Sequence, residues 1–203
     1  MVSLPNEREA RHIADADLLE VGRGVIVAEA EELALAAARL GPEIVKAARL
    51  VQACTGRLVV SGLGKSGLIG RKIAATLASL GTPAFFLHAT EGSHGDLGMV
   101  RREDVGLFIS HSGETREVLE LLPFFRRIGA PVIAMTGSLN SRLARNADVV
   151  LDAGIRREAD PLGLAPTSST TLQLALGDAL SGMVTELRGL CPEDFALFHP
   201  GGS

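Results

Sequence analysis

The sequence predicts an α/β fold, a three-layer αβα sandwich in which helices cover both faces of a five-stranded parallel sheet. Short apolar segments alternate with segments of helical periodicity from residue 58 onward. These short segments are almost continuously apolar, as parallel strands buried on both faces are. Glycine- or serine-rich turns follow two of them, at the sheet edge where folds of this class bind ligands. The predicted strands are Leu58–Val60, Ala84–Leu87, Val105–Ile109, Val132–Met135 and Val149–Leu151.

The N-terminal part of the chain is predicted to be helical and to pack on this core. A stretch from Val25 to Leu40, rich in Ala, Glu and Leu, has helical spacing, and Gly41 then ends the helix. A second helix is expected over Ile44–Val51. We therefore expect a helical region over residues 1–55 and the sandwich over residues 56–203, which together form one domain.

Composition limits the functions that the chain can have. The 203 residues suit a single domain, and 46% of them are hydrophobic, enough for a large core. Trp and Tyr are absent and the formal net charge is −4, so neither base stacking nor a basic patch indicates nucleic-acid binding. The sequence has no membrane-span or signal-peptide pattern, so we expect a cytoplasmic protein. The two cysteines, Cys54 and Cys191, do not predict a disulfide framework.

The most informative segment is the turn Ser61–Gly67, which joins the first predicted strand to a helical pattern. Such a glycine-rich turn lets backbone N–H groups approach an anion at a helix N-terminus, and Lys65 and Ser66 add a cation and a hydroxyl. The glycines also fit the G-x-G-x-x-G pattern of dinucleotide-binding proteins, but the next strand ends at His88 rather than at an acidic residue. The spacing of a Walker A loop is not met either. A phosphorylated ligand is the favoured interpretation, and a purely structural turn is the alternative.

A second polar turn, Ser110–Thr115, follows the third predicted strand and precedes the helical pattern Val118–Phe125. It offers the hydroxyls of Ser110, Ser112 and Thr115 at a helix N-terminus, and Thr115 is expected to cap that helix. One hydroxyl would suffice for capping. Three of them around a glycine therefore predict a phosphate cradle.

A third polar cluster, Thr167–Thr171, opens the long apolar helix predicted over Leu172–Leu187. Pro166 stands directly before it, as a helix start signal. The hydroxyls suit either helix capping alone or ligand binding, and the residues themselves leave both interpretations open.

Taken together, these motifs resemble the sugar isomerase (SIS) domain family, and within it the arabinose-5-phosphate isomerases. The similar runs are long, keep the family's order and cover nearly the whole chain from Ala30 onward. They are Gly62–Gly67, Gly70–Ala78, Gly81–Phe86, Ser93–Gly98, Ser112–Thr115, Pro161–Thr171, Glu193–Ala196 and Phe198–Gly202. Many arabinose-5-phosphate isomerases continue from the last motif into a pair of CBS modules. The sequence does not distinguish a short family member from an excised catalytic domain.

The resemblance implies an aldose–ketose isomerase that interconverts D-ribulose 5-phosphate and D-arabinose 5-phosphate, and so supplies synthesis of 3-deoxy-D-manno-octulosonate for the bacterial envelope. Such a reaction moves a proton between C1 and C2 through an enediol and needs no metal or redox cofactor in principle. By resemblance, Glu158 is the leading base and Glu117 a supporting acid/base. Asp160 stands where the family usually has cysteine, and this second carboxylate could raise the pKa of Glu158. The candidate carboxylates are Glu91, Glu114, Glu117, Glu120 and Glu158.

The resemblance also assigns roles to Lys65 and to the histidines. Lys65 offsets negative charge on the enediolate or the phosphate, and His199 opens the sugar ring, reaching a neighbouring subunit's site. His88 can take zinc, as an inhibitor rather than a required cofactor, while His12 is expected on the surface of the N-terminal helix. The predicted substrate-binding residues are Gly64, Ser66, Gly81, Thr82, His88, His94, Ser110, His111, Ser112, Thr115, Thr167 and Ser168.

Two other functions stand as alternatives. SIS domains also occur in transcriptional regulators as non-catalytic sugar-phosphate sensors, but no basic helix-turn-helix precedes this domain and the catalytic candidates are all present. A different phosphosugar isomerase, such as a phosphoheptose or hexulose-phosphate enzyme, is disfavoured by the motif Phe198–Gly202. The expected partners are a small sugar phosphate and further copies of the chain in a homotetramer, with no nucleic acid and no membrane.

Overall fold

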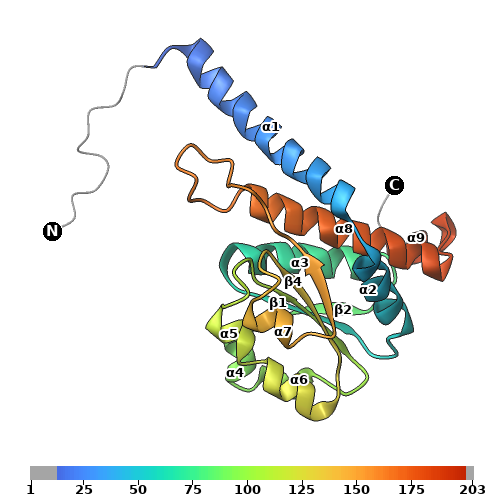
Figure 1. Ribbon diagram of the computed structural model, residues 1–203. Coiled ribbons are helices and arrows are strands. Elements are labelled where there is room, and N and C mark those ends of the chain that lie inside the picture. The colour runs from blue at the N-terminus through green and yellow to red at the C-terminus, as the bar shows by residue number, and fades with distance from the viewer. Residues whose placement is uncertain (1–12, 200–203) are drawn as a thin grey trace.

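The computed structural model describes residues 13–199, so His12 and the last residues of the Phe198–Gly202 motif lie outside the described part of the chain. Its centre is a sheet of five parallel strands in the order β2-β1-β3-β4-β5 (Figure 1). Each strand contains its predicted segment and extends it by at most two residues. The strands are β1 (Leu58–Gly62), β2 (Ala84–His88), β3 (Val105–Ile109), β4 (Val132–Thr136) and β5 (Val149–Asp152).

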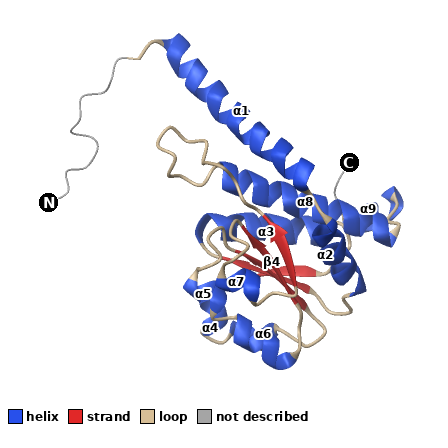
Figure 2. Ribbon diagram, in the orientation of Figure 1, coloured by secondary structure: helices blue, strands red, loops and turns tan. Residues whose placement is uncertain are grey.

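Helices cover both faces of this sheet, which confirms the three-layer αβα sandwich (Figure 2). The first face is covered by α1 (Asp15–Arg39), α2 (Pro42–Ala53), α3 (Gly64–Ser79) and α8 (Ser168–Arg188). The second is covered by α4 (Ala89–Ser93), the 3₁₀ helix η2 (Asp96–Met99), α5 (Arg116–Leu119), α6 (Leu122–Ile128) and α7 (Arg142–Arg145). A last helix, α9 (Pro192–Phe198), follows α8.

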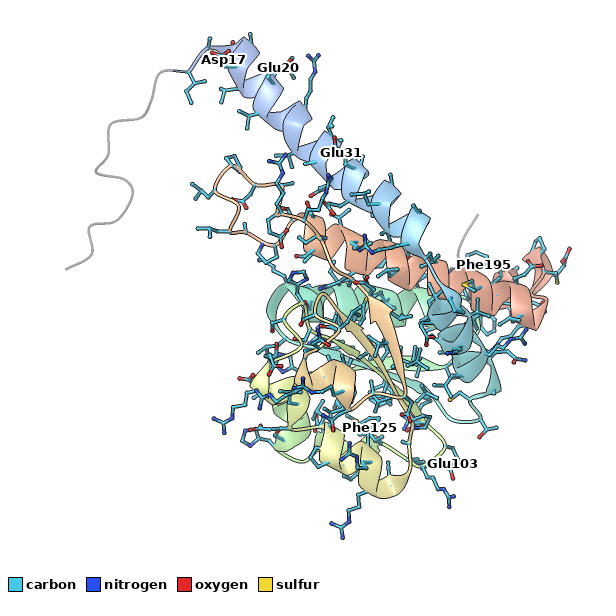
Figure 3. All side chains as sticks on the ribbon, viewed as in Figure 1. Asp17, Glu20, Glu31, Glu103, Phe125 and Phe195 are labelled. Carbon is cyan, nitrogen blue, oxygen red and sulfur yellow. The ribbon has the colours of Figure 1, made fainter. Side chains whose placement is uncertain are left out.

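The strands bury side chains on both faces because successive residues point to opposite sides of the sheet. In β1, Val60 belongs to the apolar core under α3 and α8, and Val59 belongs to the core on the other face. In that second core the rings of Phe108 and Phe125 meet edge to face, with centroids 4.9 Å apart, and Figure 3 shows Phe125 inside the fold. Replacing Phe125 with Ala would cost about 3–5 kcal/mol of stability, since both the burial and the packing would be lost.

The N-terminal helices differ in how they meet the core. Helix α2 begins with Pro42 and buries four apolar side chains, while α1 buries only Glu32 and Ala36 and projects away from the sandwich (Figure 1). Helix α1 begins at Asp15, ten residues before its predicted start. Its outer turns expose large apolar side chains, including Leu18, Leu19, Val21, Ile26 and Val27. Among the described helices, none is both long and apolar enough to cross a membrane.

The single helix predicted around Val118–Phe125 is wrong in one respect, because the structure divides it into α5 and α6. Pro123 lies in the first turn of α6. Proline has no N–H to donate to the carbonyl four residues earlier, so the first helix ends at Leu119 and a second begins at Leu122.

Candidate functional site

The first two predicted turns lie side by side at the carboxyl edge of the sheet. Gly62 at the end of β1 is in register with His88 at the end of β2 and with Ile109 at the end of β3. The turn Ser61–Gly67 therefore lies between His88 and the loop that begins at Ser110. This is also the point where the strand order reverses, since β2 and β3 flank β1 on opposite sides. Ligands bind at such a switch point in open parallel sheets.

The third polar cluster joins them because α3 and α8 run in the same direction. Gly177 of α8 packs on Ile73 of α3, each nine residues after the start of its helix, and at the far end of α8 Arg188 donates to the carbonyl of Gly81, just after α3. The N-termini of both helices thus meet at the carboxyl edge, with Ser168 at the start of α8. A helix N-terminus presents free N–H groups and a partial positive charge, which together favour an anion.

The glycine turn is shaped for a close approach to the sheet. Gly64 has a positive φ of 58°, and a Cβ atom on Gly67 would lie 2.9 Å from the carbonyl oxygen of Gly62. Lys65 is exposed and Ser66 is half-buried in the first turn of α3. Lys65 and His88 line a cavity of about 410 Å³ beside the edge strand β2, so the turn offers both a cation and backbone donors to a ligand.

The hydroxyls of the second turn divide into two kinds. Ser110 is buried, and its Oγ pairs with Thr115 Oγ1 at 2.7 Å and accepts the N–H of Gly113 at 3.1 Å. The expectation that Thr115 caps the next helix is wrong, because its side chain makes no capping hydrogen bond. Ser112 is exposed and accepts the N–H of Glu114 at 3.2 Å. Ser110 and Thr115 therefore shape the loop, and Ser112 faces outward.

The same loop is fastened to the segment after β4. The carbonyl of His111 accepts the N–H of Gly137 at 2.9 Å, and the carbonyl of Gly113 accepts the N–H of Leu143. A Cβ atom on Gly113 would lie only 2.0 Å from Ser141 Oγ, and that residue has a positive φ of 66°. Only glycine fits this position, so the fold fixes the loop geometry.

Glu114 completes that attachment. Its carboxylate accepts the backbone N–H of Arg142 at 2.7 Å and a hydrogen bond from the Arg142 guanidinium, which together hold the pKa of Glu114 below its ordinary value. Glu120 is paired in a similar way, because a hydrogen bond from Arg116 lowers its pKa. Both carboxylates are thus engaged by arginines, whereas Glu117 lies half-buried in the first turn of α5.

Glu158 is held at the start of α8. Its Oε2 accepts the N–H groups of Thr167 at 2.9 Å and Ser169 at 3.1 Å, and its Oε1 accepts the Ser169 hydroxyl. Partial burial would raise the pKa of Glu158, but the hydrogen bonds from Ser169 and Thr167 together outweigh it and lower the pKa. The carboxylate therefore replaces a serine or threonine as the cap of α8, since Thr167 makes no side-chain cap of its own.

Asp160 does not act as expected from its sequence position. The expectation that it could raise the pKa of Glu158 is wrong, because that pKa is lowered. The Asp160 carboxylate instead accepts the N–H groups of Leu162, Leu164 and Ala165 at 2.7–3.0 Å and so organises its own loop. Asp160 and Glu158 also line a cavity of about 340 Å³ between that loop and α1.

Several buried polar atoms at this edge have no hydrogen-bond partner among the described residues. They are Ser61 Oγ, His88 Nδ1, His111 Nδ1, Ser168 Oγ and both amide atoms of Gln173. Buried polar groups in proteins are normally paired, so such a group of unpaired atoms is unusual. Four of these residues lie beside the polar turns: Ser61 and His88 near the ends of β1 and β2, His111 in the loop after β3, and Ser168 at the start of α8. His94 also lies at this edge, exposed after α4.

Three of the predicted site residues lie at the opposite, amino edge of the sheet. Gly81 and Thr82 precede β2, and a Cβ atom on Gly81 would lie 2.9 Å from the Phe198 ring of α9. His199 stacks on Phe195, with ring centroids 3.8 Å apart, and Figure 3 shows Phe195 at the end of α8 far from the 153–167 loop. Helix α8 has 21 residues, which is about 30 Å of rise. Within one chain these residues therefore lie far from Glu158, and the expectation that His199 reaches a neighbouring subunit's site stays a prediction.

The sequence profile of the SIS domain matches residues 53–182. The chain belongs to the SIS domain family. The match runs from the end of α2 into α8 and includes both polar turns, Glu158 and the Thr167–Thr171 cluster.

Curated relatives resemble this SIS chain over most of its length. It is 56% identical over 166 residues to the arabinose 5-phosphate isomerase KdsD of Pseudomonas aeruginosa, a match that covers 82% of this chain and 51% of that protein. It is 50% identical over 186 residues to the arabinose 5-phosphate isomerase GutQ of Salmonella typhimurium, covering 92% and 58% respectively. The chain thus spans somewhat more than half the length of these relatives.

A solved structure also resembles this chain. The protein c3406 of E. coli CFT073, in complex with A5P, superimposes on this SIS chain with a TM-score of 0.89 at 41% sequence identity. The match covers 93% of this chain and 100% of that one. The sandwich, including the helices before β1, is therefore shared with a protein that binds A5P.

A zinc site at His88 finds little support in these residues. Zinc sites in proteins commonly have three or four ligands drawn from histidine, cysteine and carboxylates. In the part of the chain that the structure describes, no three such residues come together in a suitable group. Among these described residues His88 would supply a single ligand, which is fewer than a built zinc site has.

The structure also brings in two residues that the sequence interpretation left out. Ser169 donates its hydroxyl to Glu158, although the Thr167–Thr171 cluster gave no sign of which member faces the carboxylate. Arg71 lies over the Phe86 ring, 4.4 Å from its centroid, and lines the cavity that contains Lys65. The helical spacing of Lys65, Leu68 and Arg71 could have indicated this shared face.

Proposed function

We propose that this protein is an aldose–ketose isomerase that interconverts D-ribulose 5-phosphate and D-arabinose 5-phosphate through an enediol. The observation that carries the proposal is the Glu158 carboxylate, which is fixed at the start of α8 beside two other polar turns. The names of the curated relatives and the bound A5P of the structural neighbour support the choice of substrate. Because the chain spans only part of those relatives, their activity is carried over here as a proposal.

The phosphate group of the sugar is expected at the N-termini of α3 and α8. Ser66 and Ser168 lie in the first turns of these helices, and Ser112 faces outward from the neighbouring loop. Hydroxyls and backbone N–H groups at two helix N-termini suit a dianion. The remaining expected contacts come from Gly64, His88, His94, Ser110, His111, Thr115 and Thr167. The phosphate does not react, so these groups serve to orient C1 and C2 toward the base.

Glu158 is proposed to move the proton. In the ketose-to-aldose direction its carboxylate takes a proton from C1, the C–H electron pair forms the C1=C2 double bond, and the carbonyl oxygen at C2 is protonated to give the enediol. Returning the proton to C2 while the C1 hydroxyl gives up its proton forms the carbonyl at C1 and gives the aldose. The lowered pKa keeps Glu158 ionised near neutral pH. Lys65 offsets the developing oxyanion, and Glu117 assists as acid or base.

The proposal includes a homotetramer in which sites are shared between chains. His199, Gly81 and Thr82 lie at the amino edge, so they can serve a site like that of Glu158 only if another chain supplies them. The exposed apolar side chains of α1, on a helix that projects from the sandwich, support burial against further copies. In this arrangement His199 of a neighbouring chain opens the furanose ring of arabinose 5-phosphate when the reaction runs from aldose to ketose, since ribulose 5-phosphate, with its C5 oxygen phosphorylated, is already open-chain.

The remaining parts of the proposal concern cofactors, location and pathway. Enediol chemistry with a glutamate base requires no metal or redox cofactor, and zinc held by His88 alone would only inhibit. Cys54 and Cys191 are both free, which agrees with the reducing cytoplasm. The product feeds synthesis of 3-deoxy-D-manno-octulosonate for lipopolysaccharide or capsule. No nucleic acid or membrane takes part.

The test is to mix the purified protein with D-ribulose 5-phosphate in deuterated water and follow the sugar by NMR. We expect signals of arabinose 5-phosphate to appear, with and without a chelator, and Glu158→Gln to abolish them. Loss of turnover on chelation, with recovery on adding metal, would contradict the metal-free mechanism. Tight sugar-phosphate binding without turnover would favour the sensor function instead.

A further inference from the structure

A buried carboxylate on α1 holds the beginning of the loop that carries Glu158. Glu32 is only 2% exposed, although it belongs to a helix that is otherwise largely exposed. Its Oε1 accepts the Nε–H of Arg156 at 2.7 Å, and its Oε2 accepts the backbone N–H of Arg156 at 3.2 Å. One carboxylate thus binds both the side chain and the main chain of the same residue.

That residue is two positions before Glu158, in a long connection. Residues 153–167 join β5 to α8 without a helix or strand, and a connection of this length needs specific contacts to hold one conformation. Near the beginning of this connection, Arg156 is held to α1 by Glu32. Glu158 and Asp160 bind backbone N–H groups further along, and Figure 2 shows this loop beside α1. The Glu32–Arg156 contact therefore fixes the direction in which the chain enters the segment that contains Glu158.

The neighbouring Glu31 provides a natural comparison. Glu31, labelled on α1 in Figure 3, accepts a hydrogen bond from Nη2 of Arg156 at 3.1 Å. Its side chain, however, is 56% exposed. An exposed ion pair contributes little, because water solvates both partners when it breaks. A buried carboxylate that loses its partner remains desolvated and unpaired, which is strongly unfavourable. Losing the contact with Arg156 is therefore costly for the buried Glu32 and nearly neutral for the exposed Glu31.

We infer that Glu32 is a positioning residue for Glu158: through Arg156 it joins α1 to the loop and keeps the carboxylate at the start of α8. This inference rests on the proposed function, in which Glu158 is the base. The Glu32 carboxylate hydrogen-bonds Arg156 and none of the residues of the polar turns. Its contribution is orientation, and displacing a base by a fraction of an ångström slows proton transfer while leaving phosphate binding unchanged.

The kinetic test compares Glu32→Gln with Glu31→Gln. Glutamine has the size of glutamate, but its amide NH₂ replaces one of the two carboxylate oxygens and so faces one of the two Arg156 donors. We expect Glu32→Gln to lower kcat by about tenfold to hundredfold, the range for a misplaced reacting group, with KM little changed. Glu31→Gln should keep both constants within about twofold, as expected for an exposed pair.

A second readout does not depend on turnover. Arg156 and Arg157 are trypsin sites in the loop, so opening of the Glu32–Arg156 contact should expose them. We expect limited trypsin digestion, followed by mass spectrometry, to cut Glu32→Gln after these two residues about tenfold faster than wild type, because cleavage follows the population of the opened loop. Cleavage elsewhere should not change, and Glu31→Gln should match wild type.

The outcomes separate the two proposals. If wild type shows no isomerase activity, the proposed function fails, while the trypsin comparison still decides whether Glu32 holds the loop. The inference is overturned if both variants lose kcat equally, if KM rises with kcat unchanged, or if cleavage after Arg156 and Arg157 is not accelerated. Should Glu32→Gln fail to fold, Arg156→Ala breaks the same contact from its exposed side; the kinetic constants are then measured in the same way, and trypsin cleavage is followed after Arg157 alone, since the site after Arg156 is removed.

Discussion

Both the carboxyl and the amino edge of the sheet contain residues of the SIS sequence motifs, yet the two edges are built differently. At the carboxyl edge, two helix N-termini, several hydroxyls and Glu158 converge, and a group of buried polar atoms has no partner among the described residues. At the amino edge, His199 already stacks on Phe195 and bonds its carbonyl at 2.9 Å, close to Gly81. The first edge gathers the polar groups proposed to bind the sugar phosphate, and the second holds His199 on its own helix, away from those groups. Motif resemblance therefore does not tell whether the residues of the family's motifs lie together within one chain.

The strongest challenge to this comparison is a complementation experiment. We expect His199→Ala and Glu158→Gln each to lose most of the activity, since a general base alone contributes about 10²–10⁴-fold. Glutamine is chosen because its amide oxygen can still cap α8. If the two variants are mixed under conditions of subunit exchange, about a quarter of the sites should combine both intact residues, because each site is shared by two chains.

Exchange itself must be shown independently, for example by mass spectrometry of differently tagged chains. Restored activity would require that the two residues come from different chains. Confirmed exchange without any recovery would mean that His199 does not complete a neighbour's site.

A smaller effect is expected from Gly81→Ala, which disturbs only the amino edge. Gly81 has a φ of 74°, and a Cβ atom there would lie 2.9 Å from the Phe198 ring. Moving Phe198 displaces the end of α9 and with it His199, so we expect kcat to fall about tenfold, as for a misplaced catalytic group. Steady-state kinetics of the purified variant provide the measurement.

Gly129 offers a matched control. It has a nearly equal φ of 75°, but a Cβ atom there meets nothing within 4 Å. Both alanine variants carry the left-handed backbone cost of about 1–2 kcal/mol, so Gly129→Ala shows how much stability and activity this cost removes without a clash. Equal activities in the two variants would show that the position of α9 does not matter for turnover.

The comparison also explains how far the sequence could be interpreted. The strands were predictable because each is a short apolar segment buried on both faces of the sheet. The glycine turns were predictable from the residues at those positions alone. The split at Pro123 and the early start of α1 were not, since apolar periodicity continues across the first and is weak in the second. The two edges could be distinguished only once the bounds of β2 were known, because Gly81 and Thr82 precede this strand and His88 ends it.

The role of Glu158 shows a different limit. Its sequence position, in a polar loop after β5, suggested a mobile base with an acidic neighbour that raises its pKa. The structure ties the carboxylate to Thr167 and Ser169, which lie nine and eleven residues later. No local pattern predicts that a glutamate will take the place of a hydroxyl as helix cap, because the contact depends on how a long loop folds back.

At the carboxyl edge, the hydroxyls proposed to hold phosphate can be tested with smaller changes. We expect Ser66→Ala and Ser112→Ala to raise KM with little change in kcat, because the phosphate does not react. Each should cost about 1–2 kcal/mol, as for a hydrogen bond to a charged group. Ser79→Ala is the control, since Ser79 ends α3 at the amino edge and bonds only the Thr76 carbonyl. An unchanged KM in both test variants would remove these serines from the site.

The smallest effect concerns the pH dependence that the cap imposes on Glu158. The Ser169 hydroxyl and two N–H groups hold its pKa below the ordinary value, so the carboxylate stays ionised until the pH falls through that lowered pKa. In Ser169→Ala the hydroxyl is lost and the pKa should rise, which moves the acid limb of kcat/KM to higher pH.

The free energy of unfolding should depend on pH through the same group. The cap stabilises the fold above the unfolded-state pKa and is lost as the pH falls through the folded-state pKa, so the two proteins should differ in stability at neutral pH and converge in acid. Thr170→Val is the control, because the Thr170 hydroxyl bonds backbone carbonyls and not Glu158. An acid limb that moves equally in both variants, or in neither, would mean that Glu158 does not set the pH dependence of turnover, and the carboxyl edge would then need a different base.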